Sequence, residues 1–109
     1  MIGKYEVVTL CGSTKFKEDF IKAQESLTLK GCIVISVGLF GHADQRYQTE
    51  ITPEVKEMLD DMHKRKIDMA DRIFVINRDD YIGTSTASEI AYAKQTGKKV
   101  TYMFDHTEK

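Results

Sequence analysis

Residues 6–11 read Glu-Val-Val-Thr-Leu-Cys (EVVTLC), and a Gly-Ser-Thr turn at positions 12–14 follows them directly. This short apolar run is rich in β-branched residues, which is typical of a strand buried on both faces of a parallel sheet. Runs of the same character lie at residues 32–37 (CIVISV), 72–77 (RIFVIN) and 100–104 (VTYMF). The sequence therefore predicts strands distributed along the whole chain.

Between these strands, apolar residues recur at helical spacing. The first set is Phe16, Phe20, Ala23 and Leu27, the second is Val55, Met58, Leu59 and Met62, and the third is Ala87, Ile90, Ala91 and Ala93. Gly31 and Gly97 end the first and third helices, and Thr52-Pro53 opens the second with a cap and a first-turn proline. Strands and helices thus alternate throughout.

This alternation predicts an α/β fold. Because crossovers between parallel strands are right-handed, we expect a single-domain, flavodoxin-like three-layer sandwich, with four to five parallel strands in the order 2-1-3-4 and helices on both faces. The 109 residues suit one compact domain over residues 1–109. Ligands of such sheets bind beyond the carboxyl ends of the strands, which here means residues 12–15, 38–52 and 78–86.

Composition narrows the class of partner. Apolar residues make up 41% and charged residues 30% of the chain, which is ordinary globular usage. The 16 basic and 17 acidic side chains nearly cancel, so we expect no nucleic-acid polymer and no membrane as partner. No apolar run is long enough to span a bilayer or to form a leader after Met1, so we expect a cytoplasmic protein.

Cys11 and Cys32 are the only cysteines, and both lie at the edges of predicted strands. We interpret them as reduced core thiols, because no C-x-x-C pair is present. The sequence therefore predicts no metal and no cofactor.

The turn after the first strand is a candidate anion site. Gly12 lets backbone N–H groups of Ser13, Thr14 and Lys15 approach a ligand at the positive end of the first helix. The alternative is a tight turn in which Ser13 or Thr14 only caps that helix. Lys15 and Lys17 favour a ligand, since the helix dipole disfavours cations in a first turn.

Residues 83–89 (GTSTASE) open the third helix with several hydroxyl groups ahead of a carboxylate. One interpretation is structural, a capping box in which Thr86 caps the helix and Glu89 returns to the backbone N–H of the cap. The other is functional: Gly83, Thr84, Ser85 and Thr86 hold sugar or phosphate oxygens, and Glu89 acts as nucleophile or base. These residues alone leave both interpretations open.

The connection over residues 38–52 is long for a strand-to-helix loop, so we expect a binding loop that orders on the ligand. In it, Tyr47 is placed to stack on a base and Arg46 to pair with a phosphate, while we assign His42 no chemistry. The basic run at residues 63–66 (HKRK) is interpreted as a solvated helix face. Asp79 and Asp80 follow the third strand at its ligand-facing end.

Two motifs resemble a known family. The C-G-S-T at residues 11–14 and the G-T-x-x-x-S-E-I-A-Y-A at residues 83–93, followed by G-K-K-V at 97–100, are similar to the nucleoside 2-deoxyribosyltransferase superfamily, which includes deoxynucleoside 5′-monophosphate N-glycosidases. The resemblance implies that Glu89 attacks an anomeric carbon and that Gly12, Ser13 and Thr14 contact sugar or phosphate. It also implies a homodimer or higher homo-oligomer in which a neighbour completes each site.

The chain departs from that family at two positions. A second acid is expected near the end of the second helix, where Lys64 stands, so Asp61 and Asp68 are the candidate substitutes. Ala91 replaces a glycine that often follows the glutamate by two residues.

We therefore expect an enzyme that cleaves an N-glycosidic bond or transfers deoxyribose, acting on a small nucleoside or nucleoside monophosphate. In this hypothesis Glu89 is the nucleophile, residues 12–15 and 84–86 hold sugar and phosphate, and Asp79, Asp80 or Tyr81 contact the base. The chief alternative is a non-catalytic nucleotide-binding or signal-sensing module on the same fold. A flavin carrier, with Tyr47 and Tyr81 beside the flavin, is a second alternative.

Overall fold

Strands and helices alternate along the chain, as the sequence predicts. The computed structural model describes residues 3–40 and 51–104. Its elements are β1 (Val7–Gly12), α1 (Lys17–Leu29), β2 (Ile33–Ile35), α2 (Pro53–Asp68), β3 (Arg72–Ile76), the 3₁₀ turn η2 (Arg78–Asp80), α3 (Thr84–Gln95) and β4 (Lys99–Tyr102).

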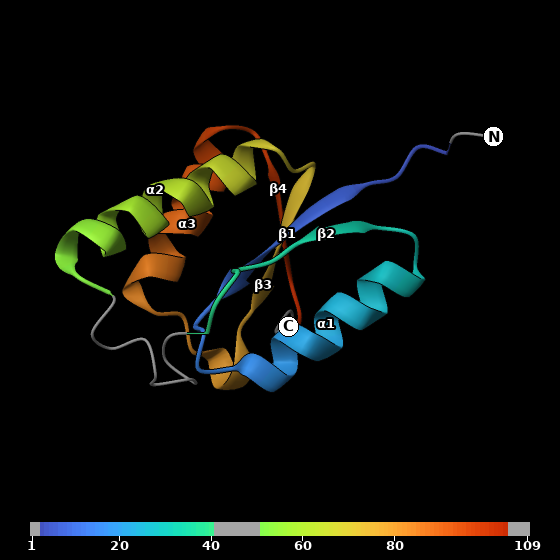
Figure 1. Cartoon of the computed structure of the whole chain (residues 1–109). Helices are drawn as coiled ribbons and strands as arrows, with labels where there is room; N and C mark the ends of the chain where they lie inside the picture. The colour runs from blue at the N-terminus through green and yellow to red at the C-terminus, as the bar shows by residue number, and fades with distance from the viewer. Residues whose placement is uncertain (1–2, 41–50, 105–109) are drawn as a thin grey trace.

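The strands form one parallel sheet in the order β2-β1-β3-β4. Figure 1 shows α1 against one face of this sheet and the pair α2 and α3 against the other. The predicted α/β class, the strand order 2-1-3-4 and helices on both faces are therefore confirmed. None of the helices in the described ranges is long and apolar enough to cross a membrane.

The alternation of side chains along β1 divides the core into two layers. Val8 and Leu10 pack with Phe20 of α1 on one face. On the other face, Cys11 packs with Ile67 of α2 and with α3. Thr9 is also buried there, and its hydroxyl donates to the Lys66 carbonyl oxygen of α2 at 2.9 Å, so this polar group is satisfied.

The predicted helix ends are confirmed. Thr52 caps α2, since its Oγ1 accepts a hydrogen bond from the Val55 backbone N–H at 3.2 Å, and Pro53 is the first helical residue. Gly31 and Gly97 follow α1 and α3 with φ of 90° and 79°, the left-handed conformation that ends helices.

Burial at the sheet edges differs from the prediction. The second strand was expected to span residues 32–37 and to be buried on both faces, but β2 covers only Ile33–Ile35 and Ile33 is 50% exposed. It is an edge strand that pairs with β1 and packs against α1, which explains both the short pairing and the exposure.

The inward face of α2 was also predicted incorrectly. Met58 and Met62 are exposed, whereas His63 and Ile67 are the buried residues of this helix. The expected solvated face at residues 63–66 is therefore wrong for His63, and Lys66 is half-buried. The reason is that Ile67 packs into the core against the sheet, while Lys56, Leu59, Asp60 and Met62 border a cavity.

Candidate functional site

A cavity of about 520 Å³ lies at the carboxyl edge of the sheet. Its walls come from the β1–α1 loop, the chain after β2, helix α2 and the start of α3. Most of the site residues predicted from the sequence line it, namely Gly12, Ser13, Thr14, Tyr81, Gly83, Thr84, Ser85, Thr86 and Glu89. Segments far apart in the sequence thus meet in one cavity, and the chemical roles of these residues remain predictions.

Other predicted residues lie elsewhere. Lys15, Asp79 and Asp80 are not among the described residues that line the cavity. The Lys15 ammonium lies 3.7 Å from the centroid of the Tyr81 ring and so covers one side of that ring. Asp79 and Asp80 occupy η2 with φ of 56° and 61°, a left-handed conformation that shapes the turn before Tyr81.

Four residues of the long connection are outside the described part of the chain. These are His42, Asp44, Arg46 and Tyr47. The base-stacking role predicted for Tyr47 and the phosphate contact predicted for Arg46 therefore stay predictions, as does ligand-induced ordering of this connection.

Gly12 fixes the close approach of β1 and β3 beneath the cavity. It has φ of 150° and pairs in register with Ile76. A Cβ atom at this position would lie 2.9 Å from the Ile76 carbonyl oxygen, closer than real Cβ contacts. Only glycine fits here without displacing backbone, so the turn that carries Ser13 and Thr14 depends on it.

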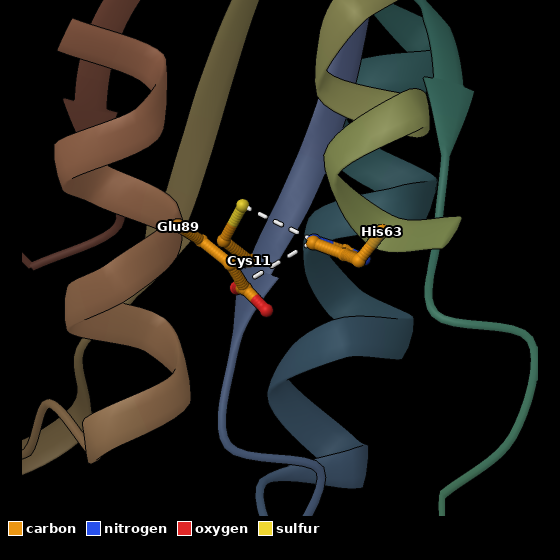
Figure 2. A group of neighbouring side chains, drawn as sticks. All are labelled: Cys11, His63 and Glu89. Atoms are coloured by element: carbon orange, nitrogen blue, oxygen red, sulfur yellow. Dashed lines mark hydrogen bonds and ion pairs between the residues drawn. The ribbon is translucent and has the colours of Figure 1, made fainter. Parts of the chain in front are cut away.

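Three side chains from different elements converge beside the cavity (Figure 2). Cys11 comes from β1, His63 from α2 and Glu89 from α3. The His63 Nε2 atom lies 3.4 Å from Cys11 Sγ and 3.6 Å from Glu89 Oε1. His63 and Glu89 line the cavity, whereas Cys11 is fully buried behind them.

Burial shifts the pKa of each of these groups toward its neutral form. It raises the pKa of Glu89 to about 7, with the negative charge of Asp60 acting in the same direction. It lowers the pKa of His63 to about 4, aided by the positive charge of Lys66. Burial also raises the pKa of the Cys11 thiol well above its usual value. At neutral pH His63 and Cys11 are therefore uncharged, and the Glu89 carboxyl group is present in both its protonated and its ionised form.

The Glu89 carboxylate is unusual because one of its oxygens is buried without a partner. Oε1 makes no hydrogen bond within the described residues. Leaving a buried polar atom unpaired costs about 1–3 kcal/mol, and more when it is charged. Such an atom at the wall of a cavity is a common property of groups that bind or transform a ligand.

The capping-box interpretation of Glu89 is wrong. Helix α3 begins at Thr84 with Gly83 as its cap, and no described side chain hydrogen-bonds as a cap there. Thr86, the expected cap residue, lies inside the helix and is buried. Glu89 is one turn further along, and its side chain is directed toward His63 (Figure 2). Glu89 therefore does not cap α3, and the functional interpretation of its carboxylate is the one that remains.

Charged residues of α2 complete the wall. Lys56, Asp60 and Lys66 line the cavity, with Lys56 Nζ 3.1 Å from an Asp60 carboxylate oxygen. The candidates for the second acid that the family resemblance implies are Asp61 and Asp68. Within the described lining residues, Asp60 is present and those two are not. Asp60 is thus an acid of α2 that lines the cavity.

Sequence reasoning missed His63 as well as Asp60. A signal was available, since Val55, Leu59, His63 and Ile67 recur every fourth residue and form one stripe of the helix. The members of this stripe are half-buried or buried in the structure. If this stripe, rather than the one with Met58 and Met62, is taken as the inward face of α2, His63 is predicted to be buried.

Comparisons with known proteins assign neither a family nor a function to this chain. The chain matches no model of a known protein family, and a search of curated proteins gives no match. Functional inference therefore depends on the geometry of the cavity and on the motifs of the sequence.

Proposed function

We propose that the protein is an enzyme that cleaves the N-glycosidic bond of a nucleoside or nucleoside monophosphate, with Glu89 as the nucleophile. The observation that carries this proposal is the Glu89 carboxylate, which is held at the wall of the cavity with one buried oxygen unpartnered. The resemblance of residues 83–93 to the nucleoside 2-deoxyribosyltransferase superfamily supports the same chemistry.

In this proposal the N-glycosidic bond is cleaved in two steps through a covalent glycosyl-enzyme. A Glu89 oxygen bonds to the anomeric carbon as the bond from that carbon to the base nitrogen breaks, and the electron pair leaves with the base, which takes up a proton from solvent. Water, or a second base, then attacks the anomeric carbon and breaks the ester, which restores the carboxylate. The oxocarbenium-like transition states on both sides of this intermediate are stabilised by the adjacent negative charge.

His63 is suited to position this carboxylate. A neutral imidazole carries one N–H, and in the tautomer with that proton on Nε2 it can donate toward Glu89 Oε1, which lies 3.6 Å from this nitrogen. A small movement of either side chain brings the pair within hydrogen-bond distance. The hydroxyls of Thr84 and Ser85 supply polar contacts of the kind that a sugar requires.

The test is base release from a panel of nucleosides and nucleoside monophosphates, followed by chromatography. We expect wild type to release base from at least one compound and Glu89→Gln to lose that activity by orders of magnitude. Glu25→Gln is the matched control, because Glu25 is exposed on α1 across the sheet. Saturable nucleotide binding without base release from any compound would instead indicate a nucleotide-binding or sensing module.

A further inference from the structure

The cluster of Cys11, His63 and Glu89 has a second chemical capacity that does not depend on the proposed function. We propose that these three side chains form a binding site for Zn²⁺, with the fourth coordination position open toward the cavity. Each residue offers one ligand atom, and the three atoms all lie within 4.8 Å of one another. They are the sulfur, imidazole nitrogen and carboxylate oxygen that zinc prefers in proteins.

The spacing of the ligand atoms suits a tetrahedral ion. Bonds of about 2.0–2.3 Å to zinc place neighbouring ligand atoms about 3.3–3.8 Å apart. The distances from His63 Nε2 to Cys11 Sγ and to Glu89 Oε1 are 3.4 and 3.6 Å, inside that range. The third pair, Cys11 Sγ and a Glu89 carboxylate oxygen, lies within 4.8 Å, so closing it around an ion requires a modest side-chain rotation. Figure 2 shows that His63 contacts both of the other side chains.

Charge balance and burial favour a dication at this point. A thiolate and a carboxylate together neutralise Zn²⁺, so the buried site carries no net charge when filled. Binding displaces the thiol proton, and the Glu89 proton where it is present, to solvent. The metal takes up the Glu89 oxygen that otherwise has no hydrogen bond within the described residues. Each ligand comes from a different rigid element, which fixes the geometry in advance.

The ligand set also selects the class of metal. A thiolate and an imidazole disfavour Mg²⁺ and Ca²⁺, which require oxygen ligands. His63 and Glu89 line the cavity while Cys11 is buried behind them, so an ion reaches the site through the cavity. Because the metal occupies a Glu89 oxygen, Zn²⁺ and attack on a sugar exclude each other, and Zn²⁺ is expected to inhibit base release.

The experiment is a titration of the full, metal-free protein with Co²⁺. The absorption spectrum of bound Co²⁺ depends on the atoms that coordinate it. Wild type should develop a sulfur-to-cobalt charge-transfer band and the intense visible bands of a four-coordinate ion, and Zn²⁺ should displace both at one ion per chain. Cys11→Ser should lose the charge-transfer band. Cys32→Ser, which changes the other free thiol, should retain it.

Competition with a chromophoric chelator gives the affinities. Cys11→Ser and His63→Gln should each bind Zn²⁺ at least about tenfold more weakly than wild type, since loss even of an outer-shell partner costs about 10–100-fold. Far-UV circular dichroism verifies that each variant is folded. Absence of the charge-transfer band in folded wild type, or its persistence in Cys11→Ser, would overturn the zinc site. Neither result depends on whether the protein releases base.

Discussion

His63 Nε2 lies 3.6 Å from Glu89 Oε1 although the two residues belong to different helices and are separated by a long stretch of sequence. Both side chains are largely buried, and the cavity lies directly beside them. Glu89 therefore stands at the cavity wall beside an imidazole, and burial together with the negative charge of Asp60 opposes the ionisation of its carboxyl group.

Ionisation of Glu89 should cost stability. Its pKa of about 7 in the folded protein is above its ordinary value of 4.5. Stability from its protonated form is therefore present below about pH 4.5 and is lost as the pH rises through about 7. At about 1.4 kcal/mol for each pKa unit, the loss is about 3 kcal/mol near pH 8.

Glu89→Gln removes this titration. Its free energy of unfolding, relative to that of wild type, should therefore increase between about pH 5 and about pH 8. Urea unfolding of both proteins at the two pH values measures the change, and any fixed cost of the buried amide cancels. An equal pH dependence in the two proteins would contradict the shifted pKa of Glu89.

Gly12→Ala should destabilise the fold strongly. The added methyl meets the Ile76 carbonyl oxygen at 2.9 Å and also forces an unfavourable backbone angle. We expect a loss of more than about 3 kcal/mol, the upper end for strained backbone alone. Gly97→Ala is the control for backbone angle, since φ is 79° there and nothing lies within 4 Å of the new methyl. Thermal or urea unfolding of both variants checks this, and equal losses would show that the close approach to Ile76 is unimportant.

The ion pair of Asp19 and Arg78 should stabilise the loop that carries Tyr81. Asp19 is buried on α1, and Arg78 of η2 donates to its Oδ1 at 2.8 Å. Hydrogen bonds from Arg78 lower the pKa of Asp19, so this stability is present above the ordinary carboxyl pKa and is lost as the pH falls.

Asp19→Asn tests this pair. Because Arg78 is half-exposed, we expect a loss of only about 1–2 kcal/mol at neutral pH. Glu18→Gln, at the exposed neighbouring position, should have little effect. Unfolding curves at neutral and acidic pH should show the difference between Asp19→Asn and wild type shrinking in acid, and a constant difference would refute the assigned cause.

Tyr81→Leu should weaken nucleotide binding if the base contacts this ring. Lys15 covers one side of the ring and Phe16 meets it edge-on, with 5.9 Å between the ring centroids, so the ring is braced. Loss of a base–aromatic contact costs about 1–3 kcal/mol, and we expect the low end, about a fivefold rise in Kd, because the ring is part-exposed. Titrations in the Glu89→Gln background avoid turnover. Tyr5→Leu, before β1 and away from the cavity, is the control, and an unchanged Kd in Tyr81→Leu would exclude the ring from the ligand contact.

The sequence predicted the architecture because its signals are local. β-branched runs, helical periodicity and the turns at Thr52, Gly31 and Gly97 each report on a few neighbouring residues, and together they give the alternation of strands and helices. The strand order then follows from the right-handed crossovers of flavodoxin-like sheets. The same logic placed the turn after β1 and the start of α3 in one cavity. It could not choose between two apolar stripes of α2, because that choice depends on where the helix meets the sheet.

The residues that were missed depend on long-range contacts. His63 opens a basic run that suggests exposure, whereas the structure buries it against Cys11 and Glu89. The position of Glu89 was predicted from its motif, but the cap of α3 was misplaced. Several consecutive hydroxyl residues offer equivalent caps in the sequence, whereas the structure uses Gly83.

If Glu89 is the nucleophile, a covalent glycosyl-enzyme forms during turnover and can be trapped. Wild type is mixed with a nucleoside that it cleaves, quenched in acid during turnover and analysed by intact mass and peptide mapping. We expect a mass increase equal to one glycosyl group, located on the α3 peptide that contains Glu89, and no such increase in Glu89→Gln. Rapid base release by wild type with no adduct under any quench, together with full activity of Glu89→Gln, would exclude Glu89 as the nucleophile.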